Sequence, residues 1–435
     1  SVLRQWEARG QVRFKQLRGF SRLFPIPMYI DETSVKFNTN NMTLSGARLH
    51  LGKSDLTLSG ELSDIRRAML RGGKLKANFE LESDLIDCNQ LMLAIGKGLQ
   101  FSDQLASNSV GAFSEDSISV LETDHLLANT VDSVATDSIS QLFVVPKFLD
   151  LTLHTNAKKI DFKDLKLEDV KGEVVIRDQS INLSDLCMSS NIGSGDLTMV
   201  YTTKTDQEAT MGFELSLNDI LVERLISLFP DIDTLVPMLR SFEGMVDCQM
   251  TATCKADSTM SVLLPSVNAS CYLSGKNMVL LDGETFTEIS KTLMFKNKKR
   301  NMIDSIAVDL AIHDNKIEVF PFLVEMDRYK VAVGGTHNLD MTFDYHLSVL
   351  KSPVPFKLGI DTKGHLDDFK FKIVKCKYKD FLKPAKQAEL DSTRRNVREE
   401  IRETIRKQIR EAAPELGNSL SEIHPHTHGH VEEST

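Results

Sequence analysis

The chain has 435 residues, of which 41% are hydrophobic, and carries 52 Lys plus Arg against 61 Asp plus Glu. Such a length allows two or three ordinary domains or one elongated, repetitive domain. The acidic balance, with a pI of about 5.7, argues against a dedicated nucleic-acid-binding protein, because those proteins usually carry a basic domain.

Two further classes are disfavoured by what the sequence lacks. No uninterrupted apolar run approaches the roughly 18 residues of a membrane-spanning helix. None of the cysteines belongs to a C-x-x-C pair, so a zinc site is not expected. The sequence starts with Ser1 and shows no signal peptide. We therefore expect a piece of a longer protein whose targeting segment lies upstream.

Residues 1–100 are predicted to form the N-terminal part of a β-groove. The segments "ARLHLGKSDLTLSGEL" and "KLKANFELES" alternate apolar and polar residues, which is the period of a strand with one apolar face. The candidate residues for that face are Leu56, Leu58, Phe79 and Leu81.

Residues 101–145 break the alternation. This segment is rich in Ser and acidic residues, and no Lys or Arg lies between Lys97 and Lys147. A polar, acidic segment cannot bury enough apolar surface to fold by itself, so we predict a flexible insertion or linker.

Residues 146–383 return to the period of two and are predicted to form the C-terminal part of the same kind of groove. The whole chain shows roughly twenty candidate strands, separated by Gly, Asn-Lys or Asp-Gly turns. "LDMTFDYHLSVL", residues 339–350, is a long example. The apolar candidates in this part are Phe213, Leu215, Val308, Leu310, Val319, Met341, Phe343, Tyr345 and Leu347.

Some of these strands form self-similar groups. Residues 44–95 and 181–229 both end in F-E-L, an Asp and an amphipathic helix, and residues 305–350 carry "FDYHLSV" at the matching place. Repetition of this kind indicates a stacked, nearly linear architecture.

Few helices are expected. Asn218 or Asp219 is a candidate N-cap for "DILVERLISLF", and "DTLVPMLRSF" and "FTEISKTLMFK" resemble two further short amphipathic helices. A longer one is predicted over 384–416, where arginines recur every fourth residue beside a stripe of Val397, Ile401, Ile405 and Ile409. This helix either packs through that stripe on the sheet or lies on an anionic membrane surface.

The tail, residues 417–435, is predicted to be disordered. It contains alternating imidazoles at His424, His426, His428 and His430. Such a tail binds divalent transition metals weakly, so these residues are weak metal candidates at most, and no metal site is expected elsewhere.

The predicted fold is therefore mainly β: a long antiparallel meander curled into an open groove (a β-taco), with a few short amphipathic helices and a charged C-terminal helix. A two-sheet sandwich would bury such apolar faces against each other, but it needs Greek-key connections rather than a meander. An open groove leaves its lining exposed unless something apolar fills it, and acyl chains suit that role.

Signatures of catalysis are missing. The sequence contains no phosphate-binding glycine loop, no G-x-S-x-G turn and no H-E-x-x-H pair. We therefore predict a non-enzymatic protein with no cofactor and no catalytic residue.

Residues 262–380 resemble the C-terminal region of the AsmA family of bacterial envelope proteins, which is related to the bridge-like lipid transfer proteins. The resemblance is carried by "YLSGKNMVLLDGETFTEISKTLMFKNKKRNMIDSIAVDLAIHDNKIEVFPFLVEMDRYKVAVGGTHNLDMTFDYHLSVL". In that family a short strand pair around "DG" leads into a helix, and a strand pair around a turn such as "HDNK" and a long final strand follow. Residues 40–98 and 160–230 are similar in pattern to other segments of the family.

The resemblance implies a periplasmic protein, anchored in the inner membrane by an N-terminal helix, that moves phospholipid toward the outer membrane along a β-groove. The expected partners are phospholipid and membrane, without nucleic acid, and protein partners are not indicated. The alternative is a structural or regulatory scaffold in outer-membrane assembly that conducts no lipid. A carbohydrate-active β-solenoid is disfavoured because only one Trp and six Tyr are present.

Overall fold

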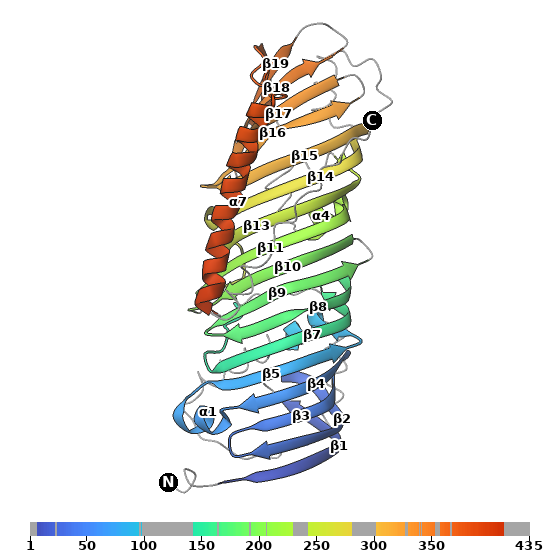
Figure 1. The fold of residues 1–435 in the computed structure, drawn as a ribbon, viewed down its shortest axis with the longest axis vertical. Coiled ribbons are helices and arrows are strands. Elements are labelled where there is room, and N and C mark those ends of the chain that lie inside the picture. Colours follow the sequence, from blue (N-terminus) through green and yellow to red (C-terminus); the bar gives the residue numbers. More distant parts are fainter. Residues whose placement is uncertain are drawn as a thin grey trace.

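The structure, a computed structural model, forms one elongated sheet in which the strands lie side by side from the N-terminal to the C-terminal end (Figure 1). It describes residues 7–21, 24–94, 97, 142–162, 165–190, 193–205, 207–228, 242–280, 302–326, 329–338, 340, 342–352, 357–365 and 368–412. The prediction of a mainly β chain with few helices is confirmed. Among these residues β1 pairs only with β2 and β20 only with β19, so the sheet is open at both ends.

The first part of the sheet precedes the acidic segment. Its elements are β1 Arg9–Ser21, β2 Phe24–Asn38, β3 Met42–Leu51, β4 Ser54–Ser63, α1 Ile65–Arg71, β5 Leu75–Ser83 and β6 Ile86–Asp87.

The second part follows that segment and contains the other strands and the long helix. Its elements are β7 Leu149–Phe162, β8 Leu165–Arg177, β9 Ser180–Ser190, β10 Gly193–Thr202, β11 Glu208–Leu221, α4 Val222–Leu228, β12 Phe242–Glu243, β13 Met245–Asp257, the 3-10 helix η3 Leu264–Ser266, β14 Asn268–Leu280, β15 Met302–His313, β16 Lys316–Met326, β17 Tyr329–Asn338, β18 Thr342–Lys351, β19 Leu358–His365, β20 Asp368–Val374 and α7 Pro384–Ala412.

The strand directions correct one part of the predicted topology. Neighbouring strands are antiparallel except that β5 and the short β6 both run parallel to β7. The expectation of a long antiparallel meander is therefore wrong at this position, and the sheet is mixed. Leu75 at the start of β5 pairs with Leu149 at the start of β7, so the chain returns to the same side before it continues. Parallel neighbours require a long connection of this kind.

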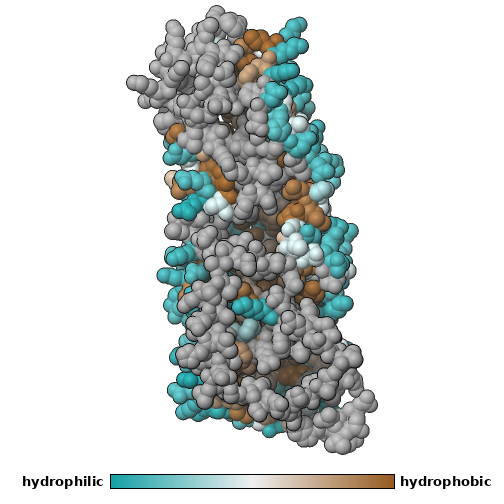
Figure 2. Space-filling view, turned by 180° about the vertical axis from the view of Figure 1, so that it is seen from behind, coloured by the Kyte–Doolittle hydropathy of each residue, from teal (hydrophilic) through white to brown (hydrophobic). Residues whose placement is uncertain are grey.

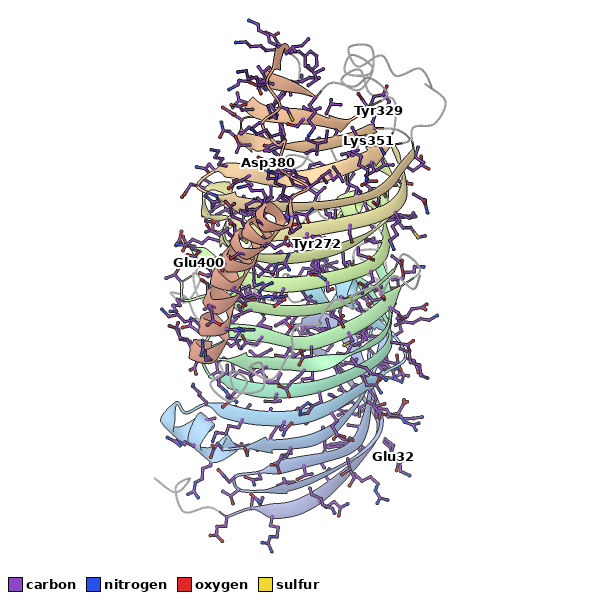
Figure 3. The ribbon with its side chains drawn as sticks, turned by 45° about the horizontal axis from the view of Figure 1, so that its top comes forward. Glu32, Tyr272, Tyr329, Lys351, Asp380 and Glu400 are labelled. Carbon is purple, nitrogen blue, oxygen red and sulfur yellow. The ribbon has the colours of Figure 1, made fainter. Side chains whose placement is uncertain are left out.

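Bulges bend several strands. Gly46, Asp185 and Asp219 have φ angles of 59°, 49° and 56°, and the strand register shifts beside each of them. A bulge adds one residue to one strand, which bends that strand and increases its twist. Gly and Asp are residue types that adopt positive φ readily. The strands are visibly bowed in Figure 3.

The helix α7 runs along one face of the sheet, beside β9, β10, β11, β13 and β14 (Figure 1). Ile401, Ile405 and Ile409 are buried together with Val200 of β10. A side chain at Gly212 would place its Cβ 3.1 Å from Ile405, so glycine at this position allows the helix to approach closely. The Val/Ile stripe of the helix therefore packs on the sheet.

Ion pairs fix the same helix in register with the strands. Arg394 and Arg398 lie 3.3 and 3.5 Å from the Asp309 carboxylate on β15, and Arg402 pairs with Glu214 on β11. Burial raises the pKa of the Asp309 carboxyl, although both arginines act in the opposite direction. In Figure 3, Glu400 marks the helix and Tyr272 marks the neighbouring strand β14.

Two other sequence expectations change, and one helix appears that was not expected. The helix expected from Asp219 begins only at Val222, because β11 continues to Leu221 and Asp219 forms its bulge. The packed chain resumes at Leu142 rather than after 145, since Leu142 and Val145 are buried and the Val145 N–H donates to Thr203. The helix α1 was not expected from the sequence.

Several expectations fall on residues that the structure does not describe. These are most of the acidic segment, the two short helices expected after residue 230, the end of the helix beyond 412 and the His-rich tail. The strands on either side of the acidic segment belong to one sheet, because β5 pairs with β7.

Replacing Ile405 with Ala should destabilise the packing of α7 on the sheet by about 2–5 kcal/mol, because the change removes buried methyl groups and leaves a cavity. Urea denaturation, combined with hydrogen exchange of the α7 amides, measures the effect. Lys407→Ala is the matched control, because Lys407 is exposed on the same helix. Equal stability of Ile405→Ala and the control would contradict the packing described above.

Candidate functional site

One cross-strand row of paired residues is apolar along almost the whole sheet. It takes one residue from each strand from β1 to β19, leaving out the two-residue strands β6 and β12. In spatial order the row is Val12, Val35, Leu44, Gly60, Phe79, Leu153, Val174, Leu183, Met199, Phe213, Ala252, Ala269, Ile312, Ile317, His337, Phe343 and Gly364. We call the face that carries this row the apolar face.

The neighbouring row, one residue along each strand, is mainly polar and points to the other side. Its members are Gln11, Lys36, Thr43, Glu61, Asn78, Thr152, Val175, Asn182, Val200, Gly212, Thr253 and Asn268. Val200 and Gly212 are the positions against which α7 packs. The helix therefore covers the polar face and leaves the apolar face to other contacts.

The apolar face is not equally buried along its length. From Ala252 to His337 the row is buried, whereas most of its members from β2 to β11, such as Phe79 and Phe213, are only half-buried. At the first strand Val12 is 39% exposed. Figure 2, which views the molecule from behind, shows separate patches of hydrophobic side chains between margins of hydrophilic ones.

The described candidates from the sequence all lie on the apolar face. Phe79, Phe213 and Phe343 belong to the row itself. The remaining nine are two or four residues from a member of the row or paired with such a residue: Leu56, Leu58, Leu81, Leu215, Val308, Leu310, Val319, Tyr345 and Leu347. Met341 lies outside the described residues.

Contacts divide ten of these twelve candidates among three groups of packed side chains, and Phe79 and Leu215 belong to none of the three. Leu56, Leu58 and Leu81 belong to a cluster with Ile86 and Ala157 near the parallel pair. Leu347 packs with Val331, Val349 and Ile360 near the last strands. The largest cluster lies between these two and contains Phe213, Val308, Leu310, Val319, Phe343 and Tyr345.

The sequence did not single out one polar pair on the apolar face. His337 and Tyr345 are both buried, and the Nδ1 atom of His337 lies 2.9 Å from the Tyr345 hydroxyl. Burial raises the pKa of the Tyr345 hydroxyl, so this group stays neutral at physiological pH. His337 is the only ionisable member of the row, and its place after an alternating "VAVGG" segment offers no signal of burial.

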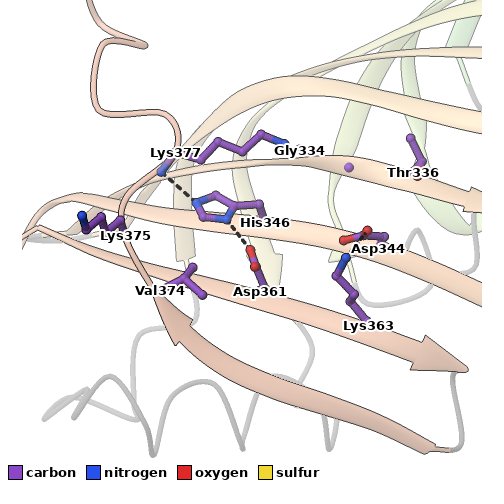
Figure 4. A pocket seen from close by; sticks show the side chains of 10 residues that line it. Gly334, Thr336, Asp344, His346, Asp361, Lys363, Val374, Lys375 and Lys377 are labelled. Carbon is purple, nitrogen blue, oxygen red and sulfur yellow. Dashed lines mark hydrogen bonds and ion pairs between the residues drawn. The ribbon is translucent and has the colours of Figure 1, made fainter.

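A polar pocket of about 460 Å³ opens on the opposite face, near the C-terminal end of the sheet (Figure 4). His346 lies at its centre. The Nδ1 atom of His346 is 2.5 Å from Asp361, and its Nε2 atom accepts the backbone N–H of Lys377 at 3.1 Å. Because Nε2 accepts that N–H, the ring proton of the neutral imidazole lies on Nδ1 and is donated to Asp361.

This pocket contains a serine, a histidine and an aspartate as in a Ser-His-Asp triad, but the serine hydroxyl is not accessible to a substrate. The Ser348 hydroxyl lies 2.9 Å from Nε2 of His346, yet Ser348 is 0% exposed and also accepts the backbone N–H of Tyr378. A nucleophile must reach its substrate. The network instead attaches the segment that leads from β20 to α7 onto the sheet.

Other chemistry finds no support in the part of the chain that the structure describes. No three His, Cys, Asp or Glu residues are placed to hold a metal ion there. The four weak metal candidates in the tail, His424, His426, His428 and His430, lie outside that part. None of the described helices is both long and apolar enough to cross a membrane.

Comparison with known proteins gives no match: no family model, no curated protein and no solved structure is similar to this chain. The assignment of a function therefore rests on the sequence and on the geometry of the sheet.

Replacing His337 with Leu should lower the free energy of unfolding by about 1–3 kcal/mol, because the buried Tyr345 hydroxyl loses a hydrogen-bond partner. The double variant His337→Leu/Tyr345→Phe should be more stable than His337→Leu, since both polar groups are then removed. Urea denaturation of the two single variants and the double variant measures the coupling. Additive losses would show that the pair contributes no interaction of its own.

Proposed function

We propose that the apolar face binds the acyl chains of phospholipid and conducts them along the sheet, with no chemical step. The observation that carries the proposal is the row from Val12 to Phe343, in which paired residues of successive strands present apolar side chains in one direction except at Gly60 and His337. Large exposed apolar surfaces usually mark binding sites. The apolar face offers partly exposed surface of this kind from β1 to β11, whereas its row is buried from Ala252 to His337.

The energetics favour acyl chains as the cargo. Exposing one methylene group to water costs about 0.8 kcal/mol, so a sixteen-carbon chain in water costs on the order of 12 kcal/mol. A continuous apolar surface removes most of that barrier at every step. At about 4.8 Å per strand the row extends roughly 80 Å, a length that suits transfer between two membranes.

The curvature of the strands suits the same role. Bulges at Gly46, Asp185 and Asp219 bend β3, β9 and β11. We infer that the sheet curls around its apolar face as an open groove of the β-taco kind. In such a groove the headgroups stay in water at the open side while the acyl chains lie against the sheet.

The resemblance to the AsmA family supports a setting for this activity. We infer a protein of the bacterial envelope that acts in the periplasm, is held at the inner membrane through an upstream segment and contributes to outer-membrane homeostasis. Fractionation of cells that express the full-length protein tests the location, and recovery in the cytosol would contradict it.

Charged substitutions on the apolar face should abolish lipid binding. Phe79→Asp, Phe213→Asp and Phe343→Asp each place a carboxylate where an acyl chain would lie, and burying such a charge is costly. Phe79 and Phe213 are only half-buried, so we expect these two variants to fold. Transfer of fluorescent phospholipid between vesicles is the measurement, and at least a tenfold loss of rate is expected.

Asn78→Asp is the matched control, because Asn78 precedes Phe79 on β5 but faces the other side of the sheet and is exposed. It should transfer lipid at the unaltered rate. Circular dichroism verifies folding of each variant. Normal transfer by folded Phe79→Asp and Phe213→Asp would refute the proposal.

One observation favours the alternative of a scaffold without lipid. Side chains such as Ile317, Leu310 and Ala252 are almost completely buried within the largest apolar cluster, as in an ordinary protein core. A scaffold would need no more than such packing. Native mass spectrometry of the purified protein separates the two functions, because a lipid carrier retains phospholipid and a scaffold does not.

A further inference from the structure

The last strand of the sheet, β20, has a free edge whose composition differs from that of the rest of the chain. β20 pairs only with β19 among the described residues, so one row of its backbone groups has no strand partner. Residues 368–379 read "DFKFKIVKCKYK" and hold five lysines and one acidic residue, in a protein whose net charge is −9. We call this segment the lysine edge.

The lysines of this edge are exposed, and no carboxylate of the described residues pairs with them. Lys370 and Lys372 lie on β20, and Lys375, Lys377 and Lys379 lie in the segment that follows it, where Lys375 and Lys377 also line the polar pocket beside His346. The neighbouring lysines differ, since Lys363 pairs with Asp344 and Lys383 with Asp380. Within the described part of the chain no carboxylate lies within ion-pair distance of the five lysines of the edge. Their charge is therefore available to an external anion.

Apolar side chains are exposed on the other side of the same strand. Phe371 is 37% exposed and Ile373 is 65% exposed, and Leu382, in the segment that leads to α7, is 49% exposed. Phe371 and Ile373 pair with Thr362 and Ile360 of β19, which places them on the apolar face. The apolar face thus ends in side chains that are open to the surroundings, with lysines beside them.

From this combination we propose that the lysine edge docks on the surface of an anionic phospholipid membrane, with Lys ammonium groups at the headgroup phosphates and Ile373 and Phe371 in the interfacial region. Charge complementarity selects this partner, because lysines near an anionic bilayer attract it and exposed apolar side chains insert beside the headgroups. A protein strand fits less well, because lysines on an edge strand discourage pairing with another strand. The proposal builds on the proposed function in one respect: docking would place the end of the apolar face at the lipid.

The first experiment measures flotation of the whole protein with vesicles of phosphatidylcholine and phosphatidylglycerol in roughly a two-to-one ratio, at about 0.1 M and about 1 M salt. The wild-type protein should float with these vesicles at low salt and much less at high salt. It should not float with pure phosphatidylcholine. Equal binding to neutral and anionic vesicles would overturn the proposal.

The second experiment reverses charge at the edge with Lys370→Glu/Lys372→Glu/Lys375→Glu. Vesicle binding should fall by at least about tenfold, since each lysine near an anionic surface contributes about fivefold to the affinity. The matched control is Lys159→Glu/Lys166→Glu/Lys171→Glu, which makes the same change at exposed lysines in the middle of the sheet. Retained binding by the edge variant, or equal losses in both variants, would refute docking through β20.

The apolar part of the edge is tested by Ile373→Ser/Leu382→Ser. Both side chains are largely exposed, so folding should be unaffected, and binding to anionic vesicles should weaken several-fold. An unaltered affinity would show that these side chains do not enter the membrane.

Uptake of a fluorescent phospholipid from detergent micelles separates this inference from the proposed function. The lysine-edge variant should load lipid as well as the wild-type protein, because its apolar face is intact. A wild-type protein that docks but loads no lipid would refute the function and leave docking standing. A protein that loads lipid but does not float with anionic vesicles would refute docking alone.

Discussion

The in-phase register of the strands is the constraint on which the rest of the structure depends. Alternation gives each strand one apolar side, but a common apolar face forms only if every strand pairs in the phase that places this side in the same direction. The row from Val12 to Phe343 shows that the phase is kept through antiparallel pairs and through the parallel β5–β7 pair. A register shift of one residue at any pair would place the apolar side chains of the following strands on the opposite face of the sheet.

Bulges maintain that phase where the sequence alone would lose it. Leu183 and Leu186 are three residues apart, so a strict period of two places them on opposite faces, yet they pair with Met199 and Leu197 on one face. Asp185, with φ of 49°, supplies the extra residue between them. Leu44 and Ala47 are related in the same way through Gly46. Each bulge therefore returns the next apolar side chains of its strand to the apolar face, and it bends the strand at the same time.

The features that could be predicted are those that follow from the alternation of apolar and polar residues within a single strand. Phe79, Phe213 and Phe343 could be assigned to one side of their strands, and the hairpin turns separated those strands. The parallel β5–β7 pair could not be predicted, because its direction depends on the path between Ser83 and Leu149 rather than on either strand. Burial of His337 was missed for a similar reason, since its partner Tyr345 lies on the next strand. The start of α4 was placed too early because Asp219 suits an N-cap and a bulge equally well.

The position of α7 accounts for the face that this helix leaves uncovered, where the short helix α4 contributes Val222 and Leu225 to the largest apolar cluster. An amphipathic helix normally covers the most apolar surface within reach, because burial of that surface supplies most of the stability of the contact. Here Arg394, Arg398 and Arg402 of α7 pair with Asp309 and Glu214, and both of these acids lie on the polar face. On that face Val200 packs against the Ile stripe, and Gly212 leaves room for Ile405. The charge pattern of the helix thus directs it away from the apolar face. Packing of the helix stabilises the middle strands from the polar face, and the surface proposed to bind acyl chains lies on the opposite face.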